Sequence, residues 1–289
     1  MHTSQGLWRL CLAGLAAWPL ASPAGNFIGL GQPGPPGWSL QLYPSWSAPL
    51  QPQATVSTFV ELSYFLPTGF TGTARDRHQF WVAAAVGHAK PAAGSSDRAA
   101  GLTGQQVAYE YYYRVIEPAQ AGDLSWWTTP LVSLSFPNGE TKASGFGAGG
   151  NQSTLQLGWN NHLSWDRWNL TFAPLSVAYA DRARHATPTS AGALARQRAG
   201  WSLTWADLAL GYRVTPDLDL GWHYAYSQYH RSASDLAPAR QGRTGPSFAY
   251  LGLMPQHQIY LAGNLSRDVQ VSSGMKASTT WSAVLVKFF

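Results

Sequence analysis

Cysteine, charge and long apolar runs are all scarce in this chain of 289 residues. Its one cysteine, Cys11, lies in an apolar stretch near the N terminus, so we expect neither disulfide bonds nor thiolate metal sites in the rest of the chain. Charged residues make up 11% of the chain, whereas soluble domains usually carry about a quarter. Beyond the N terminus there is no run of about 20 apolar residues, the length that a transmembrane helix needs. The sequence therefore fits neither an ordinary soluble domain nor a helical membrane protein.

The N terminus has the pattern of a secretory signal peptide. Arg9 precedes an apolar run, Leu10–Ala21, and small residues suited to cleavage follow it. We therefore predict a signal peptide over 1–24, an irregular lead-in rich in Gly and Pro over 25–37, and one domain over 38–289.

The chain is rich in aromatic residues and in segments where apolar and polar residues alternate. Aromatic residues make up 13%, including 14 Trp and 13 Tyr, which is enough for belts at two membrane interfaces. Segments of alternating apolar and polar residues follow one another from Trp38 onward, as in strands with one buried face. The last segment, Thr279–Phe289, is strongly apolar and ends on an aromatic residue, as the closing strand of an outer-membrane barrel does. We therefore predict an all-β fold, a transmembrane antiparallel up-and-down β-barrel of about 12 strands in the bacterial outer membrane.

The strands and connections add further support. The predicted strands cover 38–46, 54–64, 80–86, 107–115, 124–136, 154–163, 168–179, 202–214, 218–227, 248–254, 259–265 and 279–289. Most connections alternate between long and short, as expected when short turns lie in the periplasm and long loops outside. The tightest turn, around Pro216, sets Arg213 opposite Asp219 and predicts a cross-strand salt bridge near the periplasmic mouth.

Two internal stretches and the end of the chain make it resemble a known family. These are Leu131–Gly139, Leu208–Pro216 and the terminal Lys-Phe-Phe, after a Pro-Pro-Gly lead-in. They are similar to the outer-membrane barrel family associated with meta-pathway phenol degradation, often called phenol degradation protein meta. The resemblance covers most of the predicted domain and implies a barrel that passes small hydrophobic or aromatic compounds. It supplies no catalytic or ligand-binding residue.

The polar face of the strands is the predicted lumen and the expected source of function. We expect both charges, tyrosines and a histidine to line a narrow path for small, weakly polar solutes. The candidates for this path are Tyr43, Glu61, Glu110, Tyr112, Arg114, Asp207, Arg213, Asp219 and His223. The same alternation places further amides and a tyrosine on this face, namely Gln41, Gln156, Asn160, Tyr260 and Asn264. An alternative is that Glu110–Arg114 and Arg213–Asp219 are structural ion pairs that hold the barrel shut.

Two other functions stay open at this point. His162 and Ser164 share a strand face, so the imidazole could activate the hydroxyl, as in outer-membrane lipid acyl-ester hydrolases. The other alternative is a structural barrel without a conduit. We favour the channel and expect no catalytic residue.

Metal, cofactor and nucleic-acid binding are not indicated. The histidines are widely separated, and Gly145–Gly150 precedes a strand and lacks the lysine of a phosphate-binding loop. The formal net charge of +5 is scattered over loops. The expected partners are a small hydrophobic solute and outer-membrane lipid or lipopolysaccharide, which the basic external loop Arg182–Arg198 could meet. The sequence does not indicate an oligomeric state.

Overall fold

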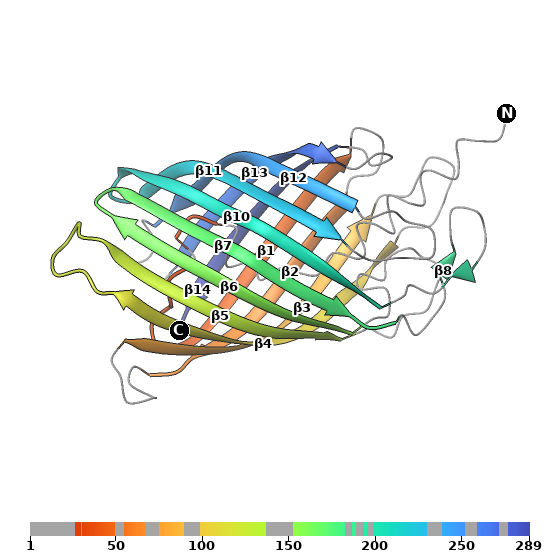
Figure 1. Cartoon of the computed structure of the whole chain (residues 1–289), viewed down its shortest axis with the longest axis horizontal. Helices are drawn as coiled ribbons and strands as arrows, with labels where there is room; N and C mark the ends of the chain where they lie inside the picture. Colours follow the sequence, from red (N-terminus) through yellow and green to blue (C-terminus); the bar gives the residue numbers. More distant parts are fainter. Residues whose placement is uncertain are drawn as a thin grey trace.

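A closed β-barrel is the framework of the protein (Figure 1). The structure, a computed structural model, describes residues 27–29, 31–49, 55–67, 75–89, 99–136, 153–182, 187–188, 194–195, 199–229, 239–251, 259–271 and 277–289. The twelve barrel strands are β1 (Gly37–Pro49), β2 (Thr55–Phe65), β3 (Asp76–Ala89), β4 (Ala99–Ile116), β5 (Ser125–Phe136), β6 (Thr154–Trp165), β7 (Trp168–Ala180), β10 (Gly200–Thr215), β11 (Leu218–Tyr229), β12 (Ala239–Tyr250), β13 (Ile259–Val271) and β14 (Ser278–Phe288). Two short strands, β8 (Thr187–Pro188) and β9 (Leu194–Ala195), form a separate pair.

The barrel is antiparallel throughout, and its last strand closes it. Each barrel strand pairs with the next one in the chain, and β14 pairs with β1 from Ser39↔Phe288 to Pro49↔Ser278. Closure leaves no free sheet edge, which is the condition for a sheet to cross a bilayer. The predicted fold class and strand number are therefore confirmed. No helix in the described ranges is long and apolar enough to span a membrane.

The two ends of the barrel differ in their connections. At one end, called here the turn end, two residues join β6 to β7 and two join β10 to β11. The C-terminal residue Phe289 lies at the turn end as well, where its N–H donates to the carbonyl of Trp38 at 2.9 Å. At the other end, the loop end, longer connections such as 137–153 and 230–238 join the strands. The predicted basic loop over 182–198 lies at the loop end, mostly outside the described residues.

Side chains alternate across the wall as a period of two requires. In β5 the burial alternates strictly from Ser125 to Leu134, with the buried set facing the lumen. Large apolar side chains stand on the outer face, where Leu157, Val82 and Trp38 are all more than half exposed. Such an apolar exterior suits lipid and does not suit water.

Two irregularities shift this alternation and decide what faces the lumen. Ala206 in β10 has a φ of +46°, and the pairing with β11 shifts between Trp205 and Leu208. On the turn-end side of this bulge Asp207 and Ala209 are buried toward the lumen. Pro174 in β7 lies where the pairing with β6 shifts as well. Bulges re-aim side chains in this way, and strand prolines are found at them.

One predicted strand was misplaced. We expected a strand over 248–254 after a long loop, but β12 begins at Ala239 and ends at Tyr250. The prediction excluded Gly242, Gly245 and Pro246 because such residues usually mark loops. In the barrel, Gly245 is needed, since a Cβ there would stand 1.9 Å from the carbonyl oxygen of Leu265. Several other strands are longer than predicted, including β3, β4 and β13.

Candidate functional site in the lumen

The half of the lumen at the turn end carries an apolar cluster beside its polar groups, whereas the half at the loop end is lined mainly by polar side chains. From the middle of the barrel to the turn end, an apolar cluster lines the wall; it includes Phe59, Phe65, Val284, Val286 and Phe288. Toward the loop end the buried side chains are amides, hydroxyls and ion pairs, among them Gln106, Ser133, Gln156, Gln241 and Asp268. A wall that faced only water would not carry this apolar cluster, because burying apolar groups requires an apolar neighbour.

That neighbour is the start of the chain. Residues 27–29 and 31–36, called here the lumen segment, lie inside the barrel at its turn end, in turns and bends. They correspond to the predicted irregular lead-in, whose place inside the barrel the sequence analysis did not foresee. Phe27 and Ile28 are buried within the apolar cluster, and Ile28 has no exposed surface.

Contacts fix the lumen segment against several strands. The hydroxyl of Tyr260 in β13 donates to the carbonyl of Ile28, and the ring of Phe27 lies 6.3 Å from that of Tyr43. Three glycine positions allow close approach between the segment and the wall. Cβ atoms would stand 2.6 Å from His162 Cβ at Gly31, 2.3 Å from Phe288 Cε1 at Gly34, and 2.6 Å from Ile28 Cγ2 at Gly211.

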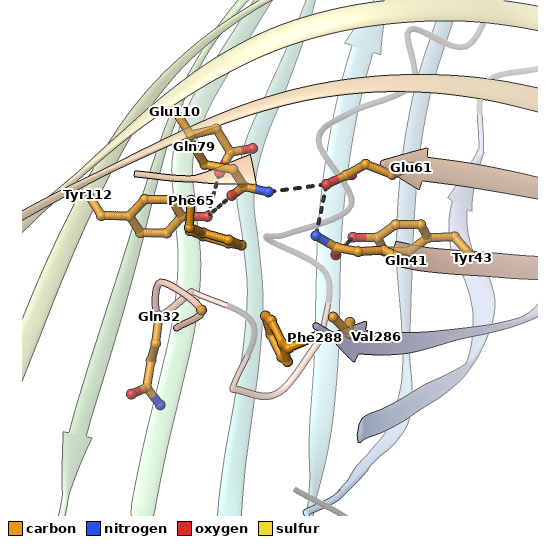
Figure 2. A pocket seen from close by; sticks show the side chains of 11 residues that line it. Gln32, Gln41, Tyr43, Glu61, Phe65, Gln79, Glu110, Tyr112, Val286 and Phe288 are labelled. Carbon is orange, nitrogen blue, oxygen red and sulfur yellow. Dashed lines mark hydrogen bonds between the residues drawn. The ribbon is translucent and has the colours of Figure 1, made fainter. Parts of the chain in front are cut away.

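A small cavity remains between the lumen segment and the wall (Figure 2). Its volume is about 30 Å³, room for one or two water molecules. Figure 2 shows Gln32 on the lumen segment, and across from it Glu61 and Tyr112 on the wall. The cavity is lined by Gln32, Gly34, Gln41, Tyr43, Glu61, Phe65, Gln79, Glu110, Tyr112, Val286 and Phe288. Polar groups thus face aromatic and aliphatic ones across a narrow gap.

A hydrogen-bond network spans β1 to β4 on the polar side of this cavity. Gln41 Nε2 donates to Glu61 Oε1 at 2.8 Å, and Gln79 Nε2 donates to the same oxygen at 3.2 Å. Tyr43 OH donates to Gln41 Oε1 at 2.5 Å. At the other end, Trp81 Nε1 donates to Glu110 Oε1 at 3.0 Å. The network holds the two buried carboxyl groups and their amide partners in fixed positions.

Tyr112 joins the two halves of the network. Its hydroxyl oxygen lies 2.7 Å from Glu110 Oε2 and 2.8 Å from Gln79 Oε1. A phenol carries one hydrogen, so it donates to one of these two acceptors at a time. A further donor, such as a solute hydroxyl or a water molecule in the cavity, would find an acceptor here.

The remaining candidates form three separate pairs, two in the lumen and one at its mouth. His223 Nε2 lies 3.1 Å from Asp207 Oδ1, both side chains being buried. Arg213 Nε donates to Asp219 Oδ1 at 3.1 Å, so the predicted salt bridge is confirmed, and the ladder places the two residues opposite each other. Arg114 pairs with Glu117 at 3.2 Å.

The alternative of an ion pair between Glu110 and Arg114 is therefore wrong. Arg114 turns toward the barrel mouth, where its guanidinium contacts Glu117 and stacks on Trp127 at 4.8 Å. The ladder shift between Arg114 and Ile116 accompanies this change of direction. Glu110 instead accepts from Trp81 and Tyr112 deeper in the lumen.

The other residues expected on the lumen face lie there as well. Gln41, Gln156, Asn160, Tyr260 and Asn264 are all buried. Sequence reasoning missed Gln79 and Trp81 in the network and the apolar part of the wall. A signal for the latter was present: Val284, Val286 and Phe288 share the strand face of Thr280 and therefore had to point inward.

His162 and Ser164 lie near the turn end of β6. The imidazole is completely buried, and its Nδ1 lies 3.0 Å from Thr171 Oγ1. Gly31 of the lumen segment covers the ring. His162 therefore has a packing role in this arrangement. Within the described ranges, no three His, Cys, Asp or Glu side chains are grouped as a metal site would require.

A closed twelve-strand barrel with an apolar exterior and an internal segment defines the class of fold, that of outer-membrane barrels. No family model and no curated protein matches the sequence. Among solved structures, an outer membrane channel from Pseudomonas putida F1 is similar with a TM-score of 0.72 and 14% identity, over 90% of this chain and 98% of that one.

Two autotransporter domains are also similar in fold. The transport unit of AIDA-I from Escherichia coli has a TM-score of 0.50 at 10% identity, over 99% of this chain and 98% of its own. The β domain of the Bordetella autotransporter BrkA has a TM-score of 0.51 at 10% identity, over 88% of this chain and 99% of its own. At such identities these likenesses establish the fold alone.

Proposed function

We propose that this protein is a channel of the bacterial outer membrane that admits small, weakly polar compounds, hydrophobic or aromatic. The observation that carries this proposal is the closed barrel whose lumen holds polar and apolar groups facing one cavity. A solute with an apolar body and one polar group would meet matching partners on both sides.

The lining of the cavity supports this class of solute. Phe65 and Phe288 offer aromatic faces, while Glu61 and the Tyr112 hydroxyl offer hydrogen-bond partners. The resemblance of the sequence to the barrels associated with phenol degradation points the same way. The similar barrel of Pseudomonas putida F1 is itself described as an outer membrane channel.

The outer face supports a place in the outer membrane. Its exposed apolar residues would contact acyl chains, and aromatic pairs such as Trp38–Tyr64 and Trp168–Tyr212 lie near the turn end, where an interfacial belt is expected. The start of the chain, with its signal-peptide pattern, fits export across the inner membrane. Outer-membrane lipid and lipopolysaccharide would then be its surroundings.

Planar-bilayer recording of the refolded protein tests the proposal. We expect discrete current steps, and we expect an aromatic alcohol to reduce the current at concentrations where a sugar of similar size does not. Heat-modifiable migration in gels establishes beforehand that the barrel has folded. If no current or solute flux above that of plain lipid appears, even in variants with a loosened lumen segment, the channel function is refuted.

We propose a channel and not an enzyme, and Ser164 provides the test. Ser164→Ala should leave current steps and solute effects unchanged, because Ser164 is not among the residues that line the cavity. If purified protein cleaves acyl esters of phospholipid or lipid A, and Ser164→Ala abolishes that cleavage, the hydrolase alternative replaces the channel.

A further inference from the structure

We propose that the cavity beside Tyr112 selects solutes that carry a hydrogen-bond donor, a hydroxyl or an amino group, over solutes of the same size that can only accept. The inference rests on the proposed channel function and narrows its class of solutes. It follows from the hydrogens of the network that lines the cavity, where acceptors outnumber the hydrogens that can reach them (Figure 2).

Most hydrogens of the network serve the side of the cavity where Glu61 lies. Gln79 Nε2 donates to Glu61 Oε1 at 3.2 Å, which leaves the amide oxygen of Gln79 as an acceptor. Gln41 Nε2 donates to the same carboxylate oxygen at 2.8 Å and to Ser63 Oγ at 3.2 Å. Tyr43 OH donates to Gln41 Oε1. These donors are therefore already engaged when the other side of the network is considered.

On that other side, one hydrogen has two acceptors. The Tyr112 hydroxyl oxygen lies 2.7 Å from Glu110 Oε2 and 2.8 Å from Gln79 Oε1, and its single hydrogen serves one of them at a time. Glu110 Oε1 accepts from Trp81 Nε1 at 3.0 Å, and hydrogen bonds donated to both oxygens favour the charged carboxylate, which has no hydrogen of its own. Because a buried acceptor without a hydrogen is costly, the acceptor that Tyr112 does not serve gains from a donor that enters the cavity.

Turning over the Gln79 amide does not supply the hydrogen. Its nitrogen would then face Tyr112, but its oxygen would stand 3.2 Å from Glu61 Oε1, and both of these atoms are acceptors. Gln32 lines the opposite side of the cavity, and within the described residues no hydrogen bond joins it to the network. The hydrogen therefore has to come from the occupant of the cavity, either water or the hydroxyl or amino group of a solute.

The size of the cavity fits such a group and not a whole solute. Its volume of about 30 Å³ admits one or two water-sized groups, so it can hold the polar head of a solute while the ring lies outside it. Phe65 and Phe288 line the same cavity and would contact the adjoining carbon atoms. A hydroxyl reproduces the hydrogen bond of the water that it displaces, whereas an ether oxygen does not.

Two isomers, benzyl alcohol and anisole, test the selection, because only the alcohol carries an O–H group. In single-channel recording of the unmodified protein, we expect benzyl alcohol to reduce the current at a concentration about tenfold below that needed for anisole. Glu110→Gln should abolish this difference. Its new amide nitrogen can donate to the Tyr112 oxygen, Tyr112 then donates to Gln79 Oε1, and the network closes without a hydrogen from the solute.

Glu117→Gln is the matched control. It removes the same charge from the exposed partner of Arg114 and leaves the network intact, so the difference between the isomers should remain. Tyr112→Phe should keep or increase that difference, since both acceptors then lose the phenol hydrogen. Heat-modifiable migration establishes that each variant is folded.

The outcomes separate the selection from the channel. If the two isomers act equally on the unmodified protein, or if Glu110→Gln still prefers the alcohol, the donor selection is overturned although the channel function stands. Loss of the preference in Glu117→Gln as well would assign it to net charge and overturn the selection too. If no variant passes ions or solute, the channel function fails and the selection fails with it. A preference for the alcohol that only Glu110→Gln removes supports both.

Discussion

The packing of Ile28 gives the sharpest prediction about the lumen. The side chain is completely buried between the barrel wall and the rest of the lumen segment. Truncating a buried Ile to Ala costs about 2–5 kcal/mol. In Ile28→Ala the loss falls on the state in which the segment is docked against the wall, because an undocked Ile28 has no such contacts to lose. The ratio of undocked to docked segment should then rise by about 30-fold to a few thousand-fold, at tenfold per 1.4 kcal/mol.

Because the segment lies inside the barrel at this height, single-channel recording measures that ratio as the fraction of time in the open state. We expect Ile28→Ala to open far more often than the unmodified protein. A matched control is Leu157→Ala, which removes a side chain of similar size from the lipid-facing wall. It should leave the open fraction unchanged, provided that the barrel folds as judged by heat-modifiable migration.

Gly211→Ala perturbs the same contact from the side of the barrel wall. A Cβ there would stand 2.6 Å from Ile28 Cγ2 and 2.8 Å from Asn169 Oδ1, so the Ile28 side chain has to shift although the sequence of the segment is intact. This variant should also open more often. If Ile28→Ala and Gly211→Ala both behave like Leu157→Ala, the lumen segment does not control opening and the reasoning from its packing is refuted.

The remaining predictions concern the barrel wall. Arg213→Ala should lower the unfolding free energy by at most about 1 kcal/mol, since Asp219 is buried but the arginine is 44% exposed and screened by solvent; a urea titration in detergent measures it. Ala206→Gly should raise stability by about 1 kcal/mol, because a φ of +46° is strained for alanine and not for glycine, and an unchanged or lower urea midpoint would contradict this. Gly245→Ala should prevent barrel assembly, because its Cβ would meet the carbonyl of Leu265 at 1.9 Å; protein that still migrates as a compact folded form would show the contact to be tolerated.

The direction in which most side chains of the barrel wall point could be predicted from the sequence, because alternation with a period of two involves only residues close together in the chain. Outward and inward residues alternate along each strand, so Glu61, Glu110 and His223 were correctly assigned to the inner face. The tight turn at Pro216 likewise fixed the register that pairs Arg213 with Asp219. Both inferences need only residues near one another in the chain.

The features that could not be predicted depend on contacts between residues that are distant in the chain. Glu110 and Arg114 share a strand face, but the ladder shift beside Arg114 and the position of Trp127 turn the guanidinium away. The network that joins Glu61 to Tyr112 runs through Gln79 on β3, whose predicted strand began one residue after it. In β12, Gly245 lies within a strand although its local propensity favours a loop. The close approach of the Leu265 carbonyl on β13 leaves no room there for a Cβ.

The inner wall of β14 shows how such a distant contact can still leave a trace in the sequence. Thr280 and Ser282 give way to Val284, Val286 and Phe288 on the same inward face, toward the turn end. In a water-filled lumen each of those three apolar side chains would lose roughly 1.5–3 kcal/mol of burial. The chain retains that stabilisation because Phe27 and Ile28 cover the wall at this height. The change from polar to apolar along a single inward face thus marks the depth to which the lumen segment reaches, and beyond it the wall returns to amides and hydroxyls.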